Sequence, residues 1–223
     1  MKKSLIAGAV LFVSASMLSG CVIHVGNGSA IDGTDFSSIL GNIDIAEGKH
    51  AGDISSVNGN VEISDHASAD DVSIVNGNLE MESHVTVNSV DIVNGDISAT
   101  SHLTVLGDVE SVNGNINLPE QSKVGGSVET VNGDITAIDT VIDKDIETLN
   151  GDISLQGSTH LVGNITYLNR ESSWGKMSDS KPTLFIGKDV VVDGNILLER
   201  PVTLELENPS LNQKVIVSYG GAQ

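Results

Sequence analysis

The chain has 223 residues, of which 11 are Lys or Arg and 30 are Asp or Glu, so its formal net charge at pH 7 is −19. A chain with this charge is repelled by nucleic acid and by anionic lipid head groups, which excludes electrostatic binding to either. High negative charge with few aromatic residues also occurs in disordered proteins, but here the apolar residues are abundant and recur in a fixed order.

The first 20 residues have the layout of a secretory signal peptide. Lys2-Lys3 is a short positive segment, the run from Ser4 to Met17 is almost entirely apolar or small, and Leu18-Ser19-Gly20 leads into Cys21. The apolar run is short for a helix that spans a membrane. Cys21 is the only cysteine, so it cannot form an internal disulfide. We therefore expect residues 1–20 to be a signal peptide.

The segment Leu-Ser-Gly-Cys resembles the lipobox of bacterial lipoproteins. The resemblance implies a thioether-linked lipid on the Cys21 sulfur, cleavage before Cys21, and acylation of the new amino group, for example by palmitate. Two or more acyl chains anchor a protein stably, whereas one chain holds it only marginally. Residue 22 is Val rather than the Asp that often retains lipoproteins in the inner membrane, so we expect the outer membrane. Residues 21–35 then form the lipidated cysteine and a tether.

The dipeptide Asn-Gly recurs along the chain at intervals of 18, 18, 19, 19 and 18 residues. A short, nearly fixed period of this kind indicates a solenoid, and isolated hairpin turns would not need to return at that interval. Both residues tolerate left-handed backbone, and stacked Asn side chains can bond to one another, so the pair suits a repeated corner. The pairs are Asn58-Gly59, Asn76-Gly77, Asn94-Gly95, Asn113-Gly114, Asn132-Gly133 and Asn150-Gly151.

Aliphatic residues alternate on both sides of each Asn-Gly pair, which indicates short β-strands separated by turns. They stand four residues before and immediately before each Asn, and three and mostly also five residues after it. In the early coils we also expect an inward-facing residue at every sixth position. That column is Val57, Ile63, Ala69, Val75, Met81, Val87, Val93, Ala99 and Val105.

The sequence thus predicts an all-β fold, a single-stranded parallel β-helix with three sides, an aliphatic lumen and 18–19 residues per coil. A period near six also suits left-handed hexapeptide helices. We favour a right-handed helix because parallel crossovers are generally right-handed and because the interval varies. The nineteenth residue is expected in the turns near Gly107 and Gly125-Gly126.

The helix is expected to cover residues 36–206, with an excursion at 170–182 that carries Trp174, the only tryptophan. Residues 207–223 are expected to form a C-terminal cap, because the open end of a solenoid must be covered.

The segments VNGNV, VNGDI and LNGDI resemble those of the bacterial putative-adhesin β-strand-repeat family and, more distantly, of the bactofilin-type polymer-forming proteins. The resemblance covers roughly residues 40–206, including the late segment IGKDVVVDGNILLERPVTLEL. It implies a parallel β-helix with structural, assembling or adhesive roles, and it supplies no catalytic residues. Most bactofilins are cytosolic, whereas this chain carries an export signal.

His66, His84 and His102 are spaced by 18 residues, so we expect one outward-facing column that continues at Gln121 and Thr140. Stacked imidazoles could share a soft metal or respond to pH. Tetrahedral zinc needs four ligands, which this column does not offer. We therefore favour a solvated surface ladder.

A second outward column lies three residues before each Asn and consists of Asp91, Glu110, Glu129 and Glu147. Carboxylate oxygens of this kind could bind a hard cation such as Ca²⁺. The alternative is an ordinary solvated acidic face that needs no cofactor.

The sequence contains no paired-carboxylate, Ser/His/Asp or P-loop signature. Polysaccharide lyases need a basic residue in an aromatic-lined cleft, and hexapeptide acyltransferases need a cytosolic acyl-CoA donor that an exported protein would not meet. We therefore predict a non-catalytic envelope lipoprotein that acts as a scaffold or adhesin-like binding surface. Its expected partners are membrane lipid and either a second copy or an envelope protein or polysaccharide. The alternative is a carbohydrate-binding or polysaccharide-active β-helix that uses Trp174.

Overall fold

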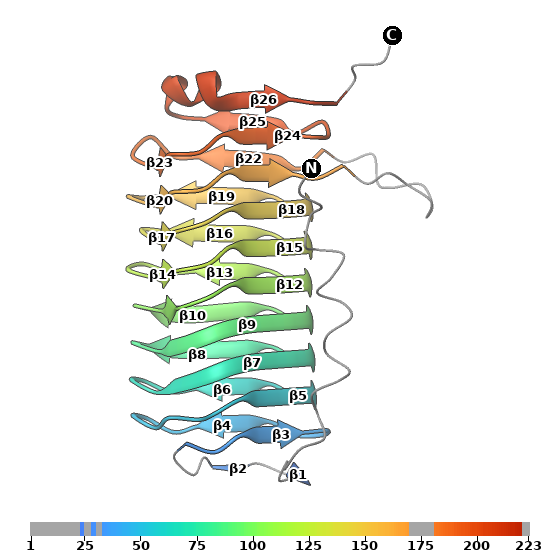
Figure 1. The fold of residues 1–223 in the computed structure, drawn as a ribbon, viewed down its shortest axis with the longest axis vertical. Helices are drawn as coiled ribbons and strands as arrows, with labels where there is room; N and C mark the ends of the chain where they lie inside the picture. The colour runs from blue at the N-terminus through green and yellow to red at the C-terminus, as the bar shows by residue number, and fades with distance from the viewer. Residues whose placement is uncertain (1–22, 25–27, 30–32, 170–180, 220–223) are drawn as a thin grey trace.

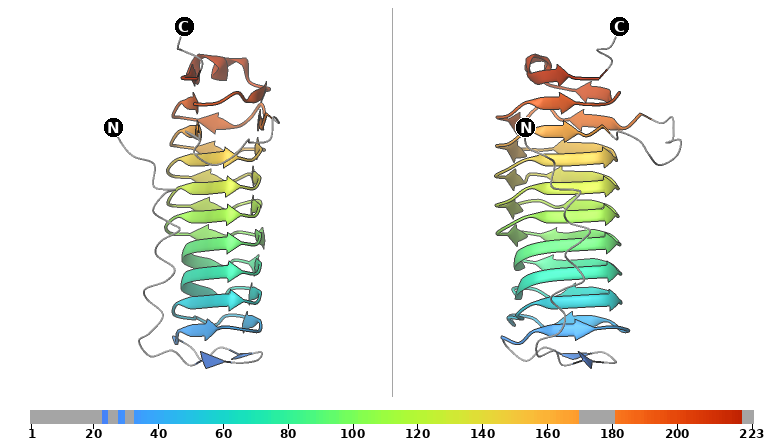
Figure 2. Two further views of the ribbon diagram at one scale, coloured as in Figure 1. Left: turned by 90° about the vertical axis from the view of Figure 1, so that its right-hand side faces the viewer. Right: turned by 45° about the vertical axis from the view of Figure 1, so that its right-hand side comes forward.

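A computed structural model describes residues 23–24, 28–29, 33–169 and 181–219. In these residues the chain forms one tube of stacked coils, and all strand pairs in it are parallel. The two views in Figure 2 show the coils lying directly above one another along a straight axis. The predicted all-β parallel solenoid is therefore confirmed.

The tube has three faces, of which the first receives one strand from each coil. These strands end at the Asn-Gly corners where such a corner is present. They are β1 (Ile23–His24), β3 (Phe36–Ser38), β5 (Ile54–Asn58), β7 (Ser68–Asn76), β9 (Thr86–Asn94), β12 (Val109–Asn113), β15 (Val128–Asn132), β18 (Ile146–Asn150), β21 (Ile165–Tyr167), β24 (Ile196–Leu198) and β26 (Val215–Val217).

The second face is a ten-stranded sheet. Its strands are β2 (Gly28–Ser29), β4 (Ile43–Ile45), β6 (Val61–Ile63), β8 (Leu79–Ser83), β10 (Ile97–Ser101), β13 (Ile116–Leu118), β16 (Ile135–Ile138), β19 (Ile153–Gln156), β22 (Thr183–Ile186) and β25 (Thr203–Leu206).

The third face is narrow. It consists of the first residues of β7 and β9 and of five short strands. These are β11 (Thr104–Val105), β14 (Lys123–Val124), β17 (Val141–Ile142), β20 (His160–Leu161) and β23 (Val191–Val192).

The tube is right-handed. In Figure 1 the first-face strands lie nearest the viewer and run from left to right, the second-face strands lie behind and run from right to left, and the chain rises from the bottom of the picture. A strand that returns to its own sheet with this hand follows the general rule for parallel crossovers.

The lumen is filled with aliphatic side chains stacked in register. Ile116 pairs with Ile135, and both side chains are 0% exposed. The lumen also holds the fully buried side chain of Tyr167, whose hydroxyl donates to the carbonyl oxygen of Thr183 at 3.0 Å. Because that polar atom has a partner, the ring can be buried without leaving its hydroxyl unpaired.

The expected inward column at every sixth residue is wrong on the first face. Val57 and its equivalents Val75 and Val93 point outward and are partly exposed, whereas Ser56, two residues before Asn58, is buried. Alternation along β5 keeps Ile54 and Ser56 inside, and the corner then uses four residues before Val61 turns inward. The inward positions therefore do not follow an unbroken period of six. Lumen positions at Ile63, Met81, Val87 and Val105 agree with the prediction.

The first nineteenth residue lies where it was expected. Val105 pairs with Val87 across 18 residues, whereas Val109 pairs with Val90 across 19, so the added residue falls in the turn around Gly107. Before this point β7 and β9 run through the corner as continuous nine-residue strands. After it the same path is broken into a short third-face strand and a separate first-face strand.

A short 3₁₀ helix, η1 (Pro209–Lys214), covers part of the C-terminal end of the tube. Its Leu211 is 4% exposed and joins the core, and the Asn208 side chain accepts the N–H of Ser210 at the start of the helix. The Lys214 ammonium donates to the carbonyl oxygens of Val192 and Asp193 in the coil below. The helix therefore covers apolar surface and satisfies carbonyl groups at the end of the stack.

The register predicts opposite effects for two neighbouring substitutions. Ile116→Asp places an unpaired charge in the lumen and should prevent folding, at a cost of several kcal/mol. Asn117→Asp, which adds the same charge on the exposed side of the strand, should change the free energy of unfolding by about 0.5 kcal/mol or less. Circular dichroism during urea unfolding measures both variants, and equal effects would contradict the register.

Candidate functional site

The Asn-Gly corners form a ladder of side-chain amides along the tube. Each Asn above Asn58 donates through Nδ2 to Oδ1 of the Asn one coil below, at 2.8–3.1 Å. At the upper end, the Arg200 guanidinium donates to Asn150 Oδ1 at 2.6 Å and to the Leu149 carbonyl oxygen. We call the six residues Asn58, Asn76, Asn94, Asn113, Asn132 and Asn150 the asparagine ladder.

The corner needs glycine because adjacent coils approach too closely for a side chain. A Cβ atom on Gly95 would lie 1.9 Å from the carbonyl oxygen of Gly77. None of the six ladder Asn residues has a positive φ, so the expectation that left-handed backbone selects Asn here is wrong. Asn is placed at this corner by hydrogen bonding and not by backbone conformation.

A second row of acceptors follows the Asn-Gly pairs, and the sequence analysis did not identify it. The Oδ1 atom of Asn60 accepts the backbone N–H of Asn78 at 3.0 Å, and Asp134 accepts that of Asp152 at 2.9 Å. The signal was present, because every Asn-Gly pair of the ladder is followed by Asn or Asp. The full row is Asn42, Asn60, Asn78, Asp96, Asn115, Asp134 and Asp152. Part of the negative charge of the chain therefore serves as hydrogen-bond acceptors for backbone.

His66, His84 and His102 form one exposed column, as predicted. Adjacent rings are stacked, with centroids 4.6 and 4.3 Å apart and planes within 9° and 19° of parallel. All three residues have a positive φ, between 52° and 61°. The column continues at Gln121, as expected, and then at Asp139.

The prediction of Thr140 as the next member of the histidine column is wrong. Asp139 is exposed and has the left-handed φ of this corner, as Gln121 does. Thr140 is instead 0% exposed, and its hydroxyl donates to the Ile138 carbonyl oxygen at 2.9 Å. The spacing from Gln121 to Asp139 is 18 residues, whereas the prediction continued the preceding interval of 19.

The stacked imidazoles do not form a chelating pair as they stand. Two imidazole nitrogens bound to one tetrahedral zinc at 2.0–2.1 Å lie about 3.3 Å apart, closer than the 4.3 Å ring spacing. Among the described residues, no group of three or more His, Cys, Asp or Glu side chains is arranged to hold a metal ion. This geometry favours the surface ladder over the shared metal.

The carboxylate column, Asp91, Glu110, Glu129 and Glu147, lies on the outer side of the first face. Glu110 pairs in register with Asp91 and Glu129, and Glu129 pairs with Glu147. The four side chains are partly exposed. The column therefore stacks like charges in four consecutive coils, as the spacing predicted.

Burial, followed by the charges of Asp91 and Asp108, raises the pKa of the Glu110 carboxyl from 4.5 to about 7. The pKa of Glu129 also rises to about 7, first through burial and then through Glu147 and Glu110. Burial, followed by the charges of Asp71 and Asp108, raises the pKa of Asp91. The column therefore holds protons at a pH where ordinary carboxyl groups have lost them.

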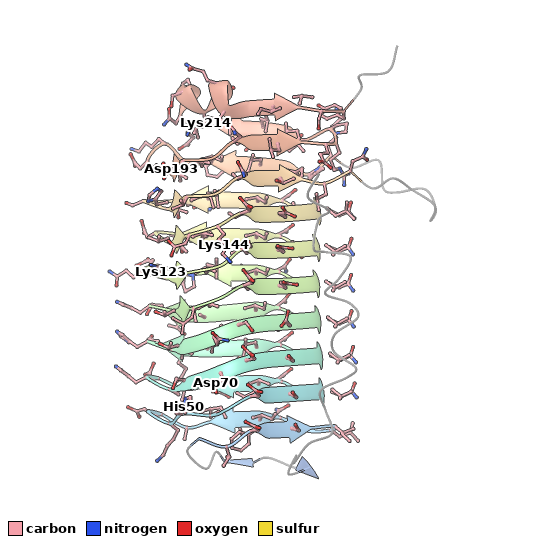
Figure 3. The ribbon with its side chains drawn as sticks, viewed as in Figure 1. His50, Asp70, Lys123, Lys144, Asp193 and Lys214 are labelled. Atoms are coloured by element: carbon pink, nitrogen blue, oxygen red, sulfur yellow. The ribbon has the colours of Figure 1, made fainter. Side chains whose placement is uncertain are left out.

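A lysine near the carboxylate column forms its ion pair with a carboxylate outside the column. The Lys144 ammonium, labelled in Figure 3, lies 3.6 Å from the Asp108 carboxylate. Within the described part of the chain, Glu129 Oε2 has neither solvent exposure nor a hydrogen-bond partner. Glu129 is thus poorly compensated in its ionised form.

Two residues singled out in the sequence, Cys21 and Trp174, lie outside the described residues. Lipidation at Cys21 and ligand binding by Trp174 stay predictions. In the described ranges, no helix has the length and apolar character that a membrane crossing would require.

Comparison of the chain with protein-family models, with curated proteins and with solved structures gave no match.

The raised pKa values predict that mild acid stabilises the protein through this column. The folded state binds more protons than the unfolded state between about pH 4.5 and 7, so this contribution is fully present below pH 4.5 and is lost as the pH rises through 7. Replacing Glu110 and Glu129 by Gln should raise the free energy of unfolding at about pH 8. Because both side chains are partly solvated, we expect about 1 kcal/mol for each carboxyl.

Urea unfolding at several pH values measures this difference, which should vanish near pH 4.5. The matched control replaces Glu62 and Glu80 by Gln, since these residues also pair in register but are exposed on the second face. An equal gain in the control, or a gain from the first pair that does not depend on pH, would contradict the prediction.

Calcium binding by the carboxylate column is a separate prediction. A cation that binds only the folded column stabilises it by mass action. Calcium should then raise the melting temperature of the unmodified protein more than sodium chloride does at equal ionic strength, and Glu110→Gln with Glu129→Gln should remove that excess. Equal shifts from the two salts would identify the column as a solvated acidic face.

Proposed function

We propose that this protein is a non-catalytic, lipid-anchored envelope protein whose tube serves as a rigid scaffold or adhesin-like binding surface. The observation that carries the proposal is the arrangement of the coils. Aliphatic side chains fill the lumen, and the outer positions repeat from coil to coil as rows of equivalent residues. A tube of this kind is suited to span a distance and to present a repeated surface, more than to enclose a single binding site.

The dimensions support the scaffold role. Each coil contributes one strand to the ten-stranded second face, and parallel strands lie about 4.8 Å apart, so the tube is on the order of 45 Å long. Most of the described backbone is bonded to the coil above or below. The tube therefore resists bending and can hold a partner at a fixed distance from its anchor.

The charge is distributed unevenly along the tube, which bears on how it would stand on a membrane. Residues 21–169 contain 23 acidic and 3 basic residues, whereas residues 170–223 contain 7 acidic and 6 basic residues. An anionic membrane surface would repel the long acidic part and not the far end. With the anchor at Cys21, this distribution favours a tube that projects from the membrane.

The anchoring part of the proposal is tested by Cys21→Ala. Without the thiol no lipid can be attached, so the variant should be found as an uncleaved precursor or as a soluble exported protein. Membrane fractionation with detergent extraction, followed by mass measurement of the chain, distinguishes these forms. A processed variant that still requires detergent would show that Cys21 is not the anchor.

The binding part is tested by photo-crosslinking in intact cells. A crosslinking residue is placed at Leu106 or Val191, which are 62% and 50% exposed on the third face, and the captured molecules are identified. The matched control carries the same residue at buried Val124. Adducts from the exposed positions alone are expected. Release of a cleaved polysaccharide by the purified protein would instead identify an enzyme.

A further inference from the structure

All six corners of the asparagine ladder contain an Asn-Gly sequence, which can form a succinimide, but the fold does not protect all six from this reaction equally. In an Asn-Gly sequence the backbone nitrogen of Gly can attack Cγ of the preceding Asn. A C–N bond forms, the Cγ–Nδ2 bond breaks, and Nδ2 leaves as ammonia with the proton lost by the Gly nitrogen. Water then opens the succinimide ring to Asp or isoaspartate. Each corner reads Val-Asn-Gly or Leu-Asn-Gly, so the local sequence favours this reaction about equally at all six.

At the four lower corners the attacking nitrogen is occupied. Gly59 donates its N–H to the main-chain carbonyl of Asn76 at 3.0 Å, and the same bond joins Gly77 to Asn94, Gly95 to Asn113 and Gly114 to Asn132 at 3.0–3.1 Å. The nitrogen must give up this bond before it can lose its proton and turn toward Cγ. In-register stacking therefore protects Asn58, Asn76, Asn94 and Asn113.

At the two upper corners this bond is missing. Within the described residues, the N–H groups of Gly133 and Gly151 donate to no main-chain or side-chain acceptor. At the upper of these two corners, the Arg200 guanidinium also donates to the Leu149 carbonyl oxygen and to Asn150 Oδ1.

We propose that Asn132 and Asn150 are sites of spontaneous succinimide formation and deamidation in the folded protein, and that the four lower ladder residues are protected. The two sites also differ in how the surrounding residues accommodate the carboxylate that deamidation creates. A carboxylate at position 150 would lie against Arg200, whose Nη1 is 2.6 Å from Asn150 Oδ1. At position 132 the new carboxylate would face Asn113 Oδ1, which now accepts from Asn132 Nδ2 at 2.9 Å, so that rung would be lost.

The test compares the six corners within one molecule. The purified full-length chain is held folded at mildly alkaline pH, samples are digested over time, and mass spectrometry measures Asp and isoaspartate at each Asn-Gly pair. A parallel sample in urea gives the rate of each corner without the fold. After division by its unfolded rate, each of Asn132 and Asn150 should react about three- to tenfold faster than the lower four, the factor that corresponds to one neutral hydrogen bond.

Two results would overturn the proposal. The first is an equal normalised rate at all six corners, which would mean that the glycine hydrogen bond does not control the reaction. The second is a faster reaction at any of the four lower corners than at Asn132 and Asn150. Amide hydrogen exchange gives an independent check at Gly133, which is partly exposed like the four lower glycines: its N–H group should exchange faster than theirs.

Discussion

In-register parallel stacking of equivalent residues is the constraint on which the rest of this structure depends. Between residues 36 and 169, strand pairing places each residue directly above the residue 18 or 19 positions earlier. Aliphatic residues therefore stack on aliphatic residues inside, and polar residues stack on their own kind outside. A side-chain contact between adjacent coils that stabilises the stack therefore recurs in every coil, and a destabilising contact recurs as well.

The asparagine ladder and the carboxylate column show the two sides of this constraint. An amide carries both a donor and an acceptor, so a stack of Asn side chains bonds to itself. An ionised carboxylate carries only acceptors, so a stack of Glu side chains repels itself unless it takes up protons or cations. Asp134 avoids this problem because its carboxylate accepts a backbone N–H from the next coil. The same stacking geometry thus stabilises one column and raises the pKa values of another.

The spacing of Asn-Gly pairs was sufficient to predict the coil length, the parallel register and the in-register columns. It failed where a corner interrupts strand alternation, so that Ser56 and not Val57 faces the lumen. It also failed at Thr140, where the interval changes from 19 to 18 and a buried residue replaces an exposed one. The contact between Arg200 and Asn150 spans 50 residues and lies outside the repeat, so no periodic argument could have found it.

Part of the uneven charge of the chain follows from the same hydrogen-bond pattern. In the body of the tube, side chains such as Asp96 accept N–H groups of the following coil, which favours acidic residues at the corners. Near the end of the stack, carbonyl groups need donors, and Arg200 and Lys214 supply them. Several acidic residues in the body and two basic residues near the end therefore serve as hydrogen-bond partners of the backbone. It follows that acidity alone does not identify a ligand in this fold. The carboxylate column differs from the corner residues because, within the described part of the chain, its Glu129 Oε2 accepts nothing.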